Sequence, residues 1–272
     1  MGQMNGIEGN RSIETANILE TVNILGTPVH RLTMAGAIQE IERRIKSGGR
    51  HQIVTANPEI LYSAHHDPSI RQLLSEASLV TADGIGVVWA ASILGKPVAE
   101  RVTGIDLMAD LLARAAKQGW PCFFYGGKPG RKEASPEEER SVAEEAARRL
   151  CDRFPGLQIA GTAHGYISAS EQAALHLQID AAKPRLLFVG LGAPRQEQWI
   201  RDFFRATTLN DIVAIGIGGS LDVFSGRVQR APQWCQQWHL EWLYRLVKEP
   251  ARWKRQLNLP RFVWAVLRQG KR

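Results

Sequence analysis

The feature that most constrains the fold of this chain is a regular alternation of short apolar runs with helical patterns. The apolar runs lie at residues 51–55, 79–82, 121–125, 185–189 and 211–215, and helix-forming stretches separate them. Neighbouring parallel strands need a crossover connection, which is most often a helix. The alternation therefore predicts an α/β fold: a doubly wound, mainly parallel sheet with helices on both faces.

Capping signals indicate where several helices begin and end. Thr33 precedes a helical pattern over residues 34–47 that stops at a Gly-Gly pair, and a second pattern covers about 104–118. Ser135 and Glu138 form a capping box with proline between them, so we expect one helix from there to about Arg153. Ser168 and Glu171 form another capping box.

Charge divides the chain into a nearly neutral body and a basic tail. The 272 residues carry a net charge of +7, but residues 227–272 alone hold 11 basic and 2 acidic residues and 5 of the 8 tryptophans. We expect a loose leader over 1–20, a core over 21–226 and a basic, Trp-rich helical appendage over 227–272. Such a tail could contact nucleic acid, anionic lipid or a phosphorylated small molecule.

Several classes of protein are excluded by motifs that are missing. Cys122, Cys151 and Cys235 lie far apart without a CxxC pair, which indicates a reducing cytoplasm rather than a disulfide framework. No apolar run approaches the roughly 20 residues of a membrane span, so any membrane contact is expected to be peripheral. The sequence has no Walker A, GxGxxG or HExxH pattern, and we expect no metal site. The adjacent His65 and His66 are expected at the surface, because neighbouring helical residues point apart.

Small and polar residues follow the expected strands. They are Thr55 and Asn57, Asp83-Gly84, Gly126-Gly127, residues 190–196 and residues 216–220. Ligands of open α/β sheets bind outside the carboxyl ends of the strands, where glycine lets the backbone approach a phosphate or sugar. The pattern predicts a ligand site at this edge.

Several longer motifs occur in a fixed order. They are TANPEI (55–60), TADGIGV (81–87), RVTGIDL (101–107), FFYGG (123–127), VGLGAPRQEQWI (189–200), GGSLDVFSG (218–226) and RAPQW…LEWLYRLVKEPARWKR (230–255). The set closely resembles the WecG/TagA/CpsF family of bacterial glycosyltransferases, over about residues 23–259. The resemblance implies a Rossmann-like core and an inverting, metal-independent transfer of a sugar, often N-acetylmannosamine or its uronic acid, from UDP. The implied acceptor is a polyprenyl-diphosphate-linked sugar at the cytoplasmic face of the membrane, and no cofactor is expected.

The resemblance also implies roles for four residues near the strand ends. Asp83 matches the family's catalytic base, although an Asp at this position could instead cap the following helix. Thr55 and Asn57 match a polar pair suited to sugar hydroxyl and acetamido groups, the alternative for Asn57 being an Asn-Pro turn. Gln196 matches an active-site residue whose amide can donate and accept. Its neighbours Arg195 and Glu197 are expected on a solvated face or in a structural pair.

The UDP diphosphate needs positive charge if no metal is bound. Arg245, Arg252 and Arg255 match arginines of the family's appendage and are predicted to bind phosphate, with Pro250 expected to break the helix between the first two. Gly126, Gly127, Gly190 and Gly192 are predicted to let the backbone approach UDP. Tyr125 could stack on uracil, although an aromatic residue in a buried strand is more often part of the core.

The tail carries two apolar patterns at helical spacing. Trp234, Trp238 and Trp242 are expected on one face of a helix, and Phe262, Val263, Val266 and Leu267 form an apolar stripe among basic residues. These faces predict peripheral binding to the anionic inner face of the cell membrane. The alternative is packing on the body or on another subunit, as in a homo-oligomer. Two other functions stay open: transfer from a different donor such as UDP-glucose, and nucleic-acid binding, against which no recognition motif is found.

Overall fold

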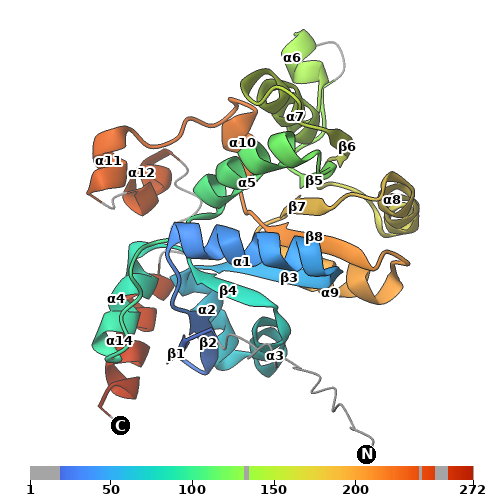
Figure 1. Cartoon of the computed structure of the whole chain (residues 1–272). Coiled ribbons are helices and arrows are strands. Elements are labelled where there is room, and N and C mark those ends of the chain that lie inside the picture. Colours follow the sequence, from blue (N-terminus) through green and yellow to red (C-terminus); the bar gives the residue numbers. More distant parts are fainter. Residues whose placement is uncertain (1–18, 132–134, 239–240, 249–256, 272) are drawn as a thin grey trace, which may run out of the picture.

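The structure is a computed structural model that describes residues 19–131, 135–238, 241–248 and 257–271 (Figure 1). Most of the expected leader over 1–20 lies outside these residues. The described chain begins with a small antiparallel hairpin of β1 (Thr21–Ile24) and β2 (Thr27–His30). No helix among the described residues is long and apolar enough to cross a bilayer.

The centre of the molecule is a six-stranded sheet with the order β4-β3-β8-β7-β5-β6, in which each neighbouring pair runs parallel. This confirms the predicted doubly wound, Rossmann-like α/β fold. Five of the six strands agree with the predicted ones to within two residues at either end, whereas the edge strand over residues 159–163 was not predicted. The strands are β3 (Gly49–Ala56), β4 (Leu79–Ala82), β5 (Cys122–Gly126), β6 (Ile159–Ala163), β7 (Leu186–Gly190) and β8 (Asp211–Gly216).

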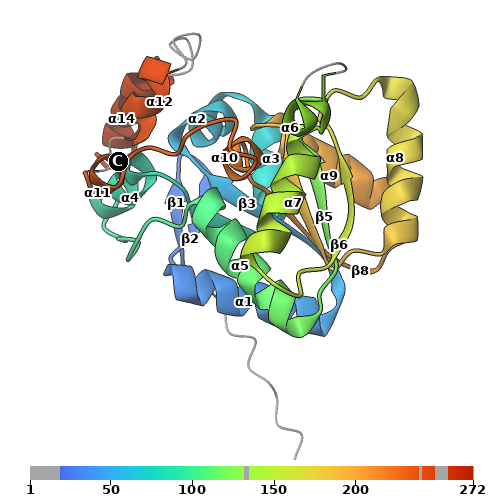
Figure 2. The same ribbon diagram turned by 90° about the horizontal axis from the view of Figure 1, so that it is seen from above.

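Helices cover both faces of the sheet, as Figures 1 and 2 show. Successive strand residues point to opposite faces: Phe124 packs with α1, α5 and α7, whereas Phe123 packs with α8 and α9. The helices are α1 (Met34–Ser47), α2 (Pro58–His66), α3 (Pro68–Glu76), α4 (Ile85–Ile93), α5 (Gly104–Gln118), α6 (Pro136–Glu139), α7 (Val142–Arg153), α8 (Ala169–Ala182), α9 (Arg195–Ala206), α10 (Ser220–Phe224), α11 (Gln233–Gln237), α12 (Glu241–Lys248) and α14 (Asn258–Gln269).

Local capping explains why three of these helices begin where the sequence predicts. The Thr33 side chain accepts a hydrogen bond from the Gly36 N–H at the start of α1. Thr103 caps α5 in the same way, and Gly119 ends that helix in the left-handed conformation that glycine adopts most easily. At α8, Ser168 and Glu171 form the expected capping box.

The prediction of one helix from Ser135 to Arg153 is wrong. The chain forms two helices, and Arg140 between them is extended. Ser141 caps α7 in a complete capping box with Glu144, whereas the Ser135 side chain makes no capping hydrogen bond. The second capping box lies six residues after the first, and a residue can cap a helix only if it is not itself inside one. The helix therefore breaks at Ser141.

The prediction that the three tail tryptophans share one helix is also wrong. The Trp238 N–H donates to the carbonyls of Trp234 and Gln236, which closes α11, and Trp242 belongs to α12. In α14 the apolar stripe is divided. Phe262 and Val266 are buried in the same cluster as residues of α2 and α4, whereas Val263 and Leu267 are exposed. The expected boundary at residue 226 between core and appendage stays a prediction.

Candidate active site

Asp83 lies directly after β4, at the carboxyl edge of the sheet. Its N–H donates to the Ala56 carbonyl at 2.8 Å, which extends the pairing of β3 and β4 by one residue. The Asp83 carboxylate accepts a hydrogen bond at 3.3 Å from the N–H of Gly104, the first residue of α5. The cap of α4 is Gly84, which has no side chain. Asp83 is therefore not the N-cap residue of the helix that follows it, and its carboxylate contacts the positive N-terminal end of α5.

Thr55 lies at the end of β3, beside Asp83 and the start of α5. Its side chain is buried and donates a hydrogen bond to the Gly216 carbonyl of β8 at 3.0 Å. A Cβ atom on Gly104 would come within 3.2 Å of the Thr55 hydroxyl oxygen, so the close approach of α5 depends on that glycine. These contacts bring Asp83 and Thr55 to one end of the carboxyl edge of the sheet, which we call the crevice because ligands of open α/β sheets bind there.

Asn57 combines a structural role with its predicted one. Its side-chain oxygen accepts the Ile60 N–H at 3.0 Å and caps α2, with Pro58 as the first helical residue. The helix therefore uses one of the two lone pairs of the side-chain oxygen. A contact with a sugar stays a prediction, for which the amide nitrogen has two N–H donors.

Gln196 joins two loops of the crevice. Its side chain is only 3% exposed, and its oxygen accepts hydrogen bonds from the N–H groups of Gly192 at 3.2 Å and Gly218 at 3.0 Å. Its amide nitrogen donates to Glu197 at 2.7 Å. Both lone pairs of the oxygen are thus in use, so the geometry gives Gln196 a positioning role, and direct contact with a sugar stays a prediction.

Glu197 is a buried carboxyl group that accepts a hydrogen bond from Gln196, which contradicts one of its two expected positions, the solvated face. It is 1% exposed, and among the described residues its second carboxyl oxygen, Oε2, has no hydrogen-bond partner. Burial raises the pKa of Glu197 to about 7, against the smaller opposing effect of the Gln196 hydrogen bond. The sequence gives no signal of this, because Glu197 stands among polar residues at the start of a helix.

The four glycines predicted to approach UDP differ in what surrounds them. A Cβ atom would meet the Gly190 carbonyl at 2.4 Å from Gly126, Val142 at 2.4 Å from Gly127 and the Gly218 carbonyl at 2.8 Å from Gly190. At these three positions glycine is needed because other atoms of the protein occupy the space that a side chain would fill. Gly192, with a φ of 77°, would meet nothing within 4 Å and faces open space, as does Gly218 with a φ of 53°.

The crevice contains a topological switch point between β5 and β7. The chain leaves β5 toward the edge strand β6 but leaves β7 toward β8, in the opposite direction. Such divergence is where open α/β sheets bind ligands. Three and a half strand spacings, about 17 Å, separate this point from β4 and Asp83. An elongated ligand could therefore lie from the switch point to Asp83 along the ends of β7, β8 and β3.

Tyr125 belongs to the core rather than to this crevice. It is 1% exposed, its ring lies 4.6 Å from that of Trp199, and its hydroxyl accepts from the Gln172 side chain at 3.5 Å. Burial raises the pKa of Tyr125. The core interpretation is confirmed, and stacking on uracil would require this ring to leave the core.

Ion pairs join the appendage to the edge of the crevice. Arg101 contacts Glu241 of α12 at 2.6 Å, and Arg230 makes two hydrogen bonds to Asp106 of α5, at 2.7 and 2.8 Å. Burial opposes ionisation of Asp106, but the hydrogen bonds from Arg230 and Thr103 outweigh it and hold the pKa of Asp106 below its usual value. The sequence reasoning missed these residues, although Arg101 and Asp106 both lie in the RVTGIDL motif.

Comparison with known proteins supports a transferase. A family model described as "Glycosyl transferase WecG/TagA/CpsF family" matches residues 22–272. The chain belongs to this family. It is 41% identical over 219 residues to the N-acetylglucosaminyldiphosphoundecaprenol N-acetyl-beta-D-mannosaminyltransferase of Bacillus spizizenii, which covers 80% of this chain and 79% of the relative. The protein of the same name from Staphylococcus aureus strain MW2 is 31% identical over 263 residues, 96% of this chain and 98% of the relative.

As a member of the WecG/TagA/CpsF family, the chain is a glycosyltransferase and more narrowly a hexosyltransferase. Of the three arginines expected to bind phosphate, Arg245 lies in α12, one turn after Glu241. Arg252 and Arg255 lie outside the described residues, as does Pro250. Because the Arg101–Glu241 ion pair holds the start of α12 beside the loop between α4 and α5, and the Val102 N–H of that loop donates to the Ala82 carbonyl, the helix that carries Arg245 begins near the crevice.

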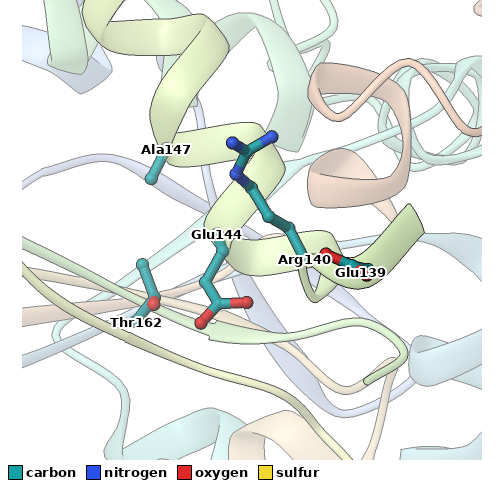
Figure 3. Close-up of a pocket in the computed structure, with 5 residues that line it drawn as sticks. All are labelled: Glu139, Arg140, Glu144, Ala147 and Thr162. Atoms are coloured by element: carbon teal, nitrogen blue, oxygen red, sulfur yellow. The ribbon is translucent and has the colours of Figure 1, made fainter. Parts of the chain in front are cut away.

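A separate hollow of about 510 Å³ lies away from these residues (Figure 3). It lies beside β6, about 24 Å across the sheet from β4. Its lining residues are Glu139, Arg140, Glu144, Ala147 and Thr162. Glu144 serves the capping box of α7, and Arg140 contacts Glu145 at 3.4 Å. Two polar groups of this hollow, Glu144 and Arg140, are thus used at the start of α7, and the position of the transferase site stays a prediction.

Proposed function

We propose that this glycosyltransferase transfers N-acetylmannosamine from a UDP-sugar to N-acetylglucosaminyl-diphospho-undecaprenol, with inversion and without a metal ion. The family match and the two relatives support the transferred sugar and the acceptor. The relative from Staphylococcus aureus aligns with 96% of this chain, so the comparison includes both the crevice and the appendage.

The observation that carries the mechanism is the position of the Asp83 carboxylate, at the carboxyl edge of the sheet against the first N–H of α5. In the proposed reaction this carboxylate takes the proton from the acceptor hydroxyl. The hydroxyl oxygen then forms a bond to the anomeric carbon of the donor, while the bond from that carbon to the β-phosphate oxygen breaks. UDP leaves with the electron pair, from the face opposite to the attack, which inverts the anomeric centre.

The departing diphosphate needs compensating charge. In the proposal the backbone N–H groups near the open glycines Gly192 and Gly218 contact it, together with Arg245, Arg252 and Arg255 of the appendage. The described residues contain no group of three or more His, Cys, Asp or Glu side chains placed to hold a metal ion. Arginine stays charged at every physiological pH and binds phosphate through two parallel hydrogen bonds, which suits this role.

In the proposal the enzyme acts at the inner face of the cell membrane, because its proposed acceptor is linked to a lipid. Large apolar side chains are exposed on α11, α12, α14 and α4, which Figures 1 and 2 draw together at one end of the molecule. They include Trp234, Trp238, Trp242, Val263, Trp264 and Leu267. Because α4 begins at the carboxyl edge of the sheet, this apolar surface lies at the end of the molecule where the acceptor would enter.

The test measures UDP release from a panel of UDP-sugars with a polyprenyl-diphosphate-N-acetylglucosamine analogue, with and without EDTA. We expect UDP-N-acetylmannosamine to be the preferred donor and EDTA to have no effect. The Asp83→Asn variant should lose about 10²–10⁴-fold in kcat, because it can no longer accept the proton.

The matched control is Asp110→Asn, which makes the same change at an exposed position of α5. It should keep the parental rate. A near-parental rate for the Asp83→Asn variant would overturn the assignment of the base, and preference for UDP-glucose would overturn the proposed donor.

A further inference from the structure

A second cavity lies where α14 packs against α2 and the turn between β1 and β2. It has a volume of about 450 Å³, and α14 and α2 lie side by side at the end of the molecule that holds the C-terminus (Figures 1 and 2). The residues that line it are Leu25, Gly26, Tyr62, His65, His66, Arg71, Trp264, Ala265, Arg268 and Gln269.

This cavity is lined by basic and apolar side chains and by no carboxylate among the described residues. Arg71 and Arg268 are its two guanidinium groups, and within the described part of the chain neither forms an ion pair with an acidic side chain. Many other arginines do, among them Arg101 with Glu241 and Arg114 with Glu42. The cavity therefore concentrates positive charge that the protein itself does not neutralise.

The walls of the cavity are held in place by specific contacts. The Gln269 side chain accepts the Leu25 N–H and donates to the Asn23 carbonyl, both at 2.8 Å, which ties the end of α14 to the β1–β2 turn. Gly26 has a φ of 90°, and a Cβ atom there would lie 3.1 Å from the Arg71 side chain. The Arg268 guanidinium lies 3.5 Å from the centre of the Trp264 ring, a cation–π contact that orients it.

A large aromatic side chain that lines the cavity is exposed: Trp264 of α14, at 57%. Val263, Trp264 and Leu267 are exposed on α14, and Ile93 is exposed on the adjacent α4. A tryptophan beside basic residues is typical of surfaces that lie at the level of lipid headgroups. The combination of two guanidinium groups with an exposed tryptophan, on a helix that exposes further apolar side chains, matches a phosphate ester that carries acyl chains.

We propose that this cavity binds the headgroup phosphate of an anionic glycerophospholipid, with the acyl chains against the exposed apolar face of α14. The site is separate from the crevice. Asn57 caps the N-terminal end of α2 at the crevice, whereas His65 and His66 lie at the other end of the helix, about 12 Å away. The choice of a membrane lipid as the ligand rests on the proposed location of the enzyme at the membrane. The site itself does not depend on the transfer reaction.

The experiment measures binding of the full chain to vesicles of phosphatidylglycerol in phosphatidylcholine, by flotation at a fixed salt concentration. The test variant is Arg71→Gln/Arg268→Gln. The control is Arg261→Gln/Lys271→Gln, which removes the same charge from exposed positions of α14 and the residues after it that do not line the cavity. We expect the test variant to lose at least tenfold more affinity for the anionic vesicles than the control variant.

Equal losses in the two variants would overturn the proposal, because they would show general attraction to the negative surface and no specific site. Full competition by millimolar glycerol phosphate would also overturn it, because the ligand would then be a free phosphate ester. UDP release with a water-soluble acceptor analogue should stay at the parental rate in the test variant. If vesicle binding is lost while the rate of UDP release stays unchanged, the defect lies at the cavity and not in the proposed transfer reaction. The charge-preserving Arg71→Lys/Arg268→Lys variant should have an affinity for the anionic vesicles between those of the test and control variants. Such an affinity would also show that the fold is intact.

Discussion

At the scale of single residues, Glu197 links protonation to the geometry of the crevice. Its carboxyl lies beneath Gly216 at the end of β8, where a Cβ atom would come within 2.8 Å of it. It accepts the hydrogen bond that orients the Gln196 amide, and Gln196 in turn holds the Gly192 and Gly218 loops. A neutral, protonated Glu197 can be buried at much lower cost than an ionised one.

This burial predicts how stability depends on pH. Burial raises the pKa of Glu197 from its ordinary 4.5 to about 7, so between these values the folded protein holds a proton that the unfolded chain has released. The stabilisation from this site is complete below about pH 4.5 and is lost as the pH rises through 7. The Glu197→Gln variant, which cannot ionise, should therefore gain stability relative to the parent between pH 5 and pH 8, by up to about 3 kcal/mol. Urea unfolding at a series of pH values measures this difference.

The control for this experiment is Glu139→Gln, at an exposed carboxylate of α6. Its stability relative to the parent should stay nearly constant over the same range. If the stability of the Glu197→Gln variant followed the parent at every pH, Glu197 would be ionised in the folded protein and its burial would not raise its pKa.

At the scale of secondary-structure elements, the start of α7 shows how two capping signals compete. Ser135-Pro136 and Ser141-Val142 each open a helix, but only Ser141 has both hydrogen bonds of a capping box. The N-terminus of α7 also packs against the crevice, since Val142 fills the space left by Gly127. The cap at Ser141 thus fixes the position of Val142, which contacts Gly127 in the loop that follows β5.

We expect Ser141→Ala to lower the free energy of unfolding by about 1 kcal/mol, because the Glu144 N–H loses its partner, the Ser141 hydroxyl. Ser135→Ala is the matched variant and should cost a few tenths of that at most, since its side chain makes no cap. Urea denaturation of both proteins measures the difference. A larger loss for the Ser135→Ala variant would favour the single helix that the sequence predicts.

At the scale of the whole molecule, the ion pairs between appendage and body connect residues that are far apart in the chain. Glu241 and Arg101 have side chains that are 12% and 17% exposed, and Arg230 lies between Asp106 and Glu241. The Val102 N–H also donates to the Ala82 carbonyl beside Asp83, so the loop that carries Arg101 follows the edge of the crevice. The start of α12 is therefore joined to the crevice by mostly buried charges.

Removing the charge of Glu241 should loosen this connection. In the Glu241→Gln variant we expect faster hydrogen exchange of the amides at 241–248 and a kcat/KM for UDP release at least tenfold lower, because α12 carries Arg245. The control is Glu42→Gln, which breaks the Arg114–Glu42 pair of similar length on α1 and α5, away from the appendage. Unchanged exchange and activity in the Glu241→Gln variant would mean that these ion pairs do not position α12.

Local patterns in the sequence were sufficient for most of the fold. The strands at 79–82 and 211–215 and the helices capped by Thr33 and Thr103 could be predicted, because apolar periodicity and caps act over a few neighbouring residues. The order of the strand ends then placed Asp83, Thr55 and Asn57 at one edge, and the motifs around them indicated the family. Two errors, at Ser141 and at Trp238, arose where the local signal for a continuous helix lost to a competing cap or turn.

The sequence by itself thus determined the class of fold, the edge of the sheet that holds the site and the residue types available there. Only the tertiary structure decided that Glu197 is buried, that Gln196 joins two loops, that Gly192 faces open space while Gly126 does not, and that Arg101 holds α12. Each of these depends on atoms contributed by segments far apart in the chain. The neighbours that folding brings together set the pKa of a carboxyl group and decide whether a glycine position has room for a side chain.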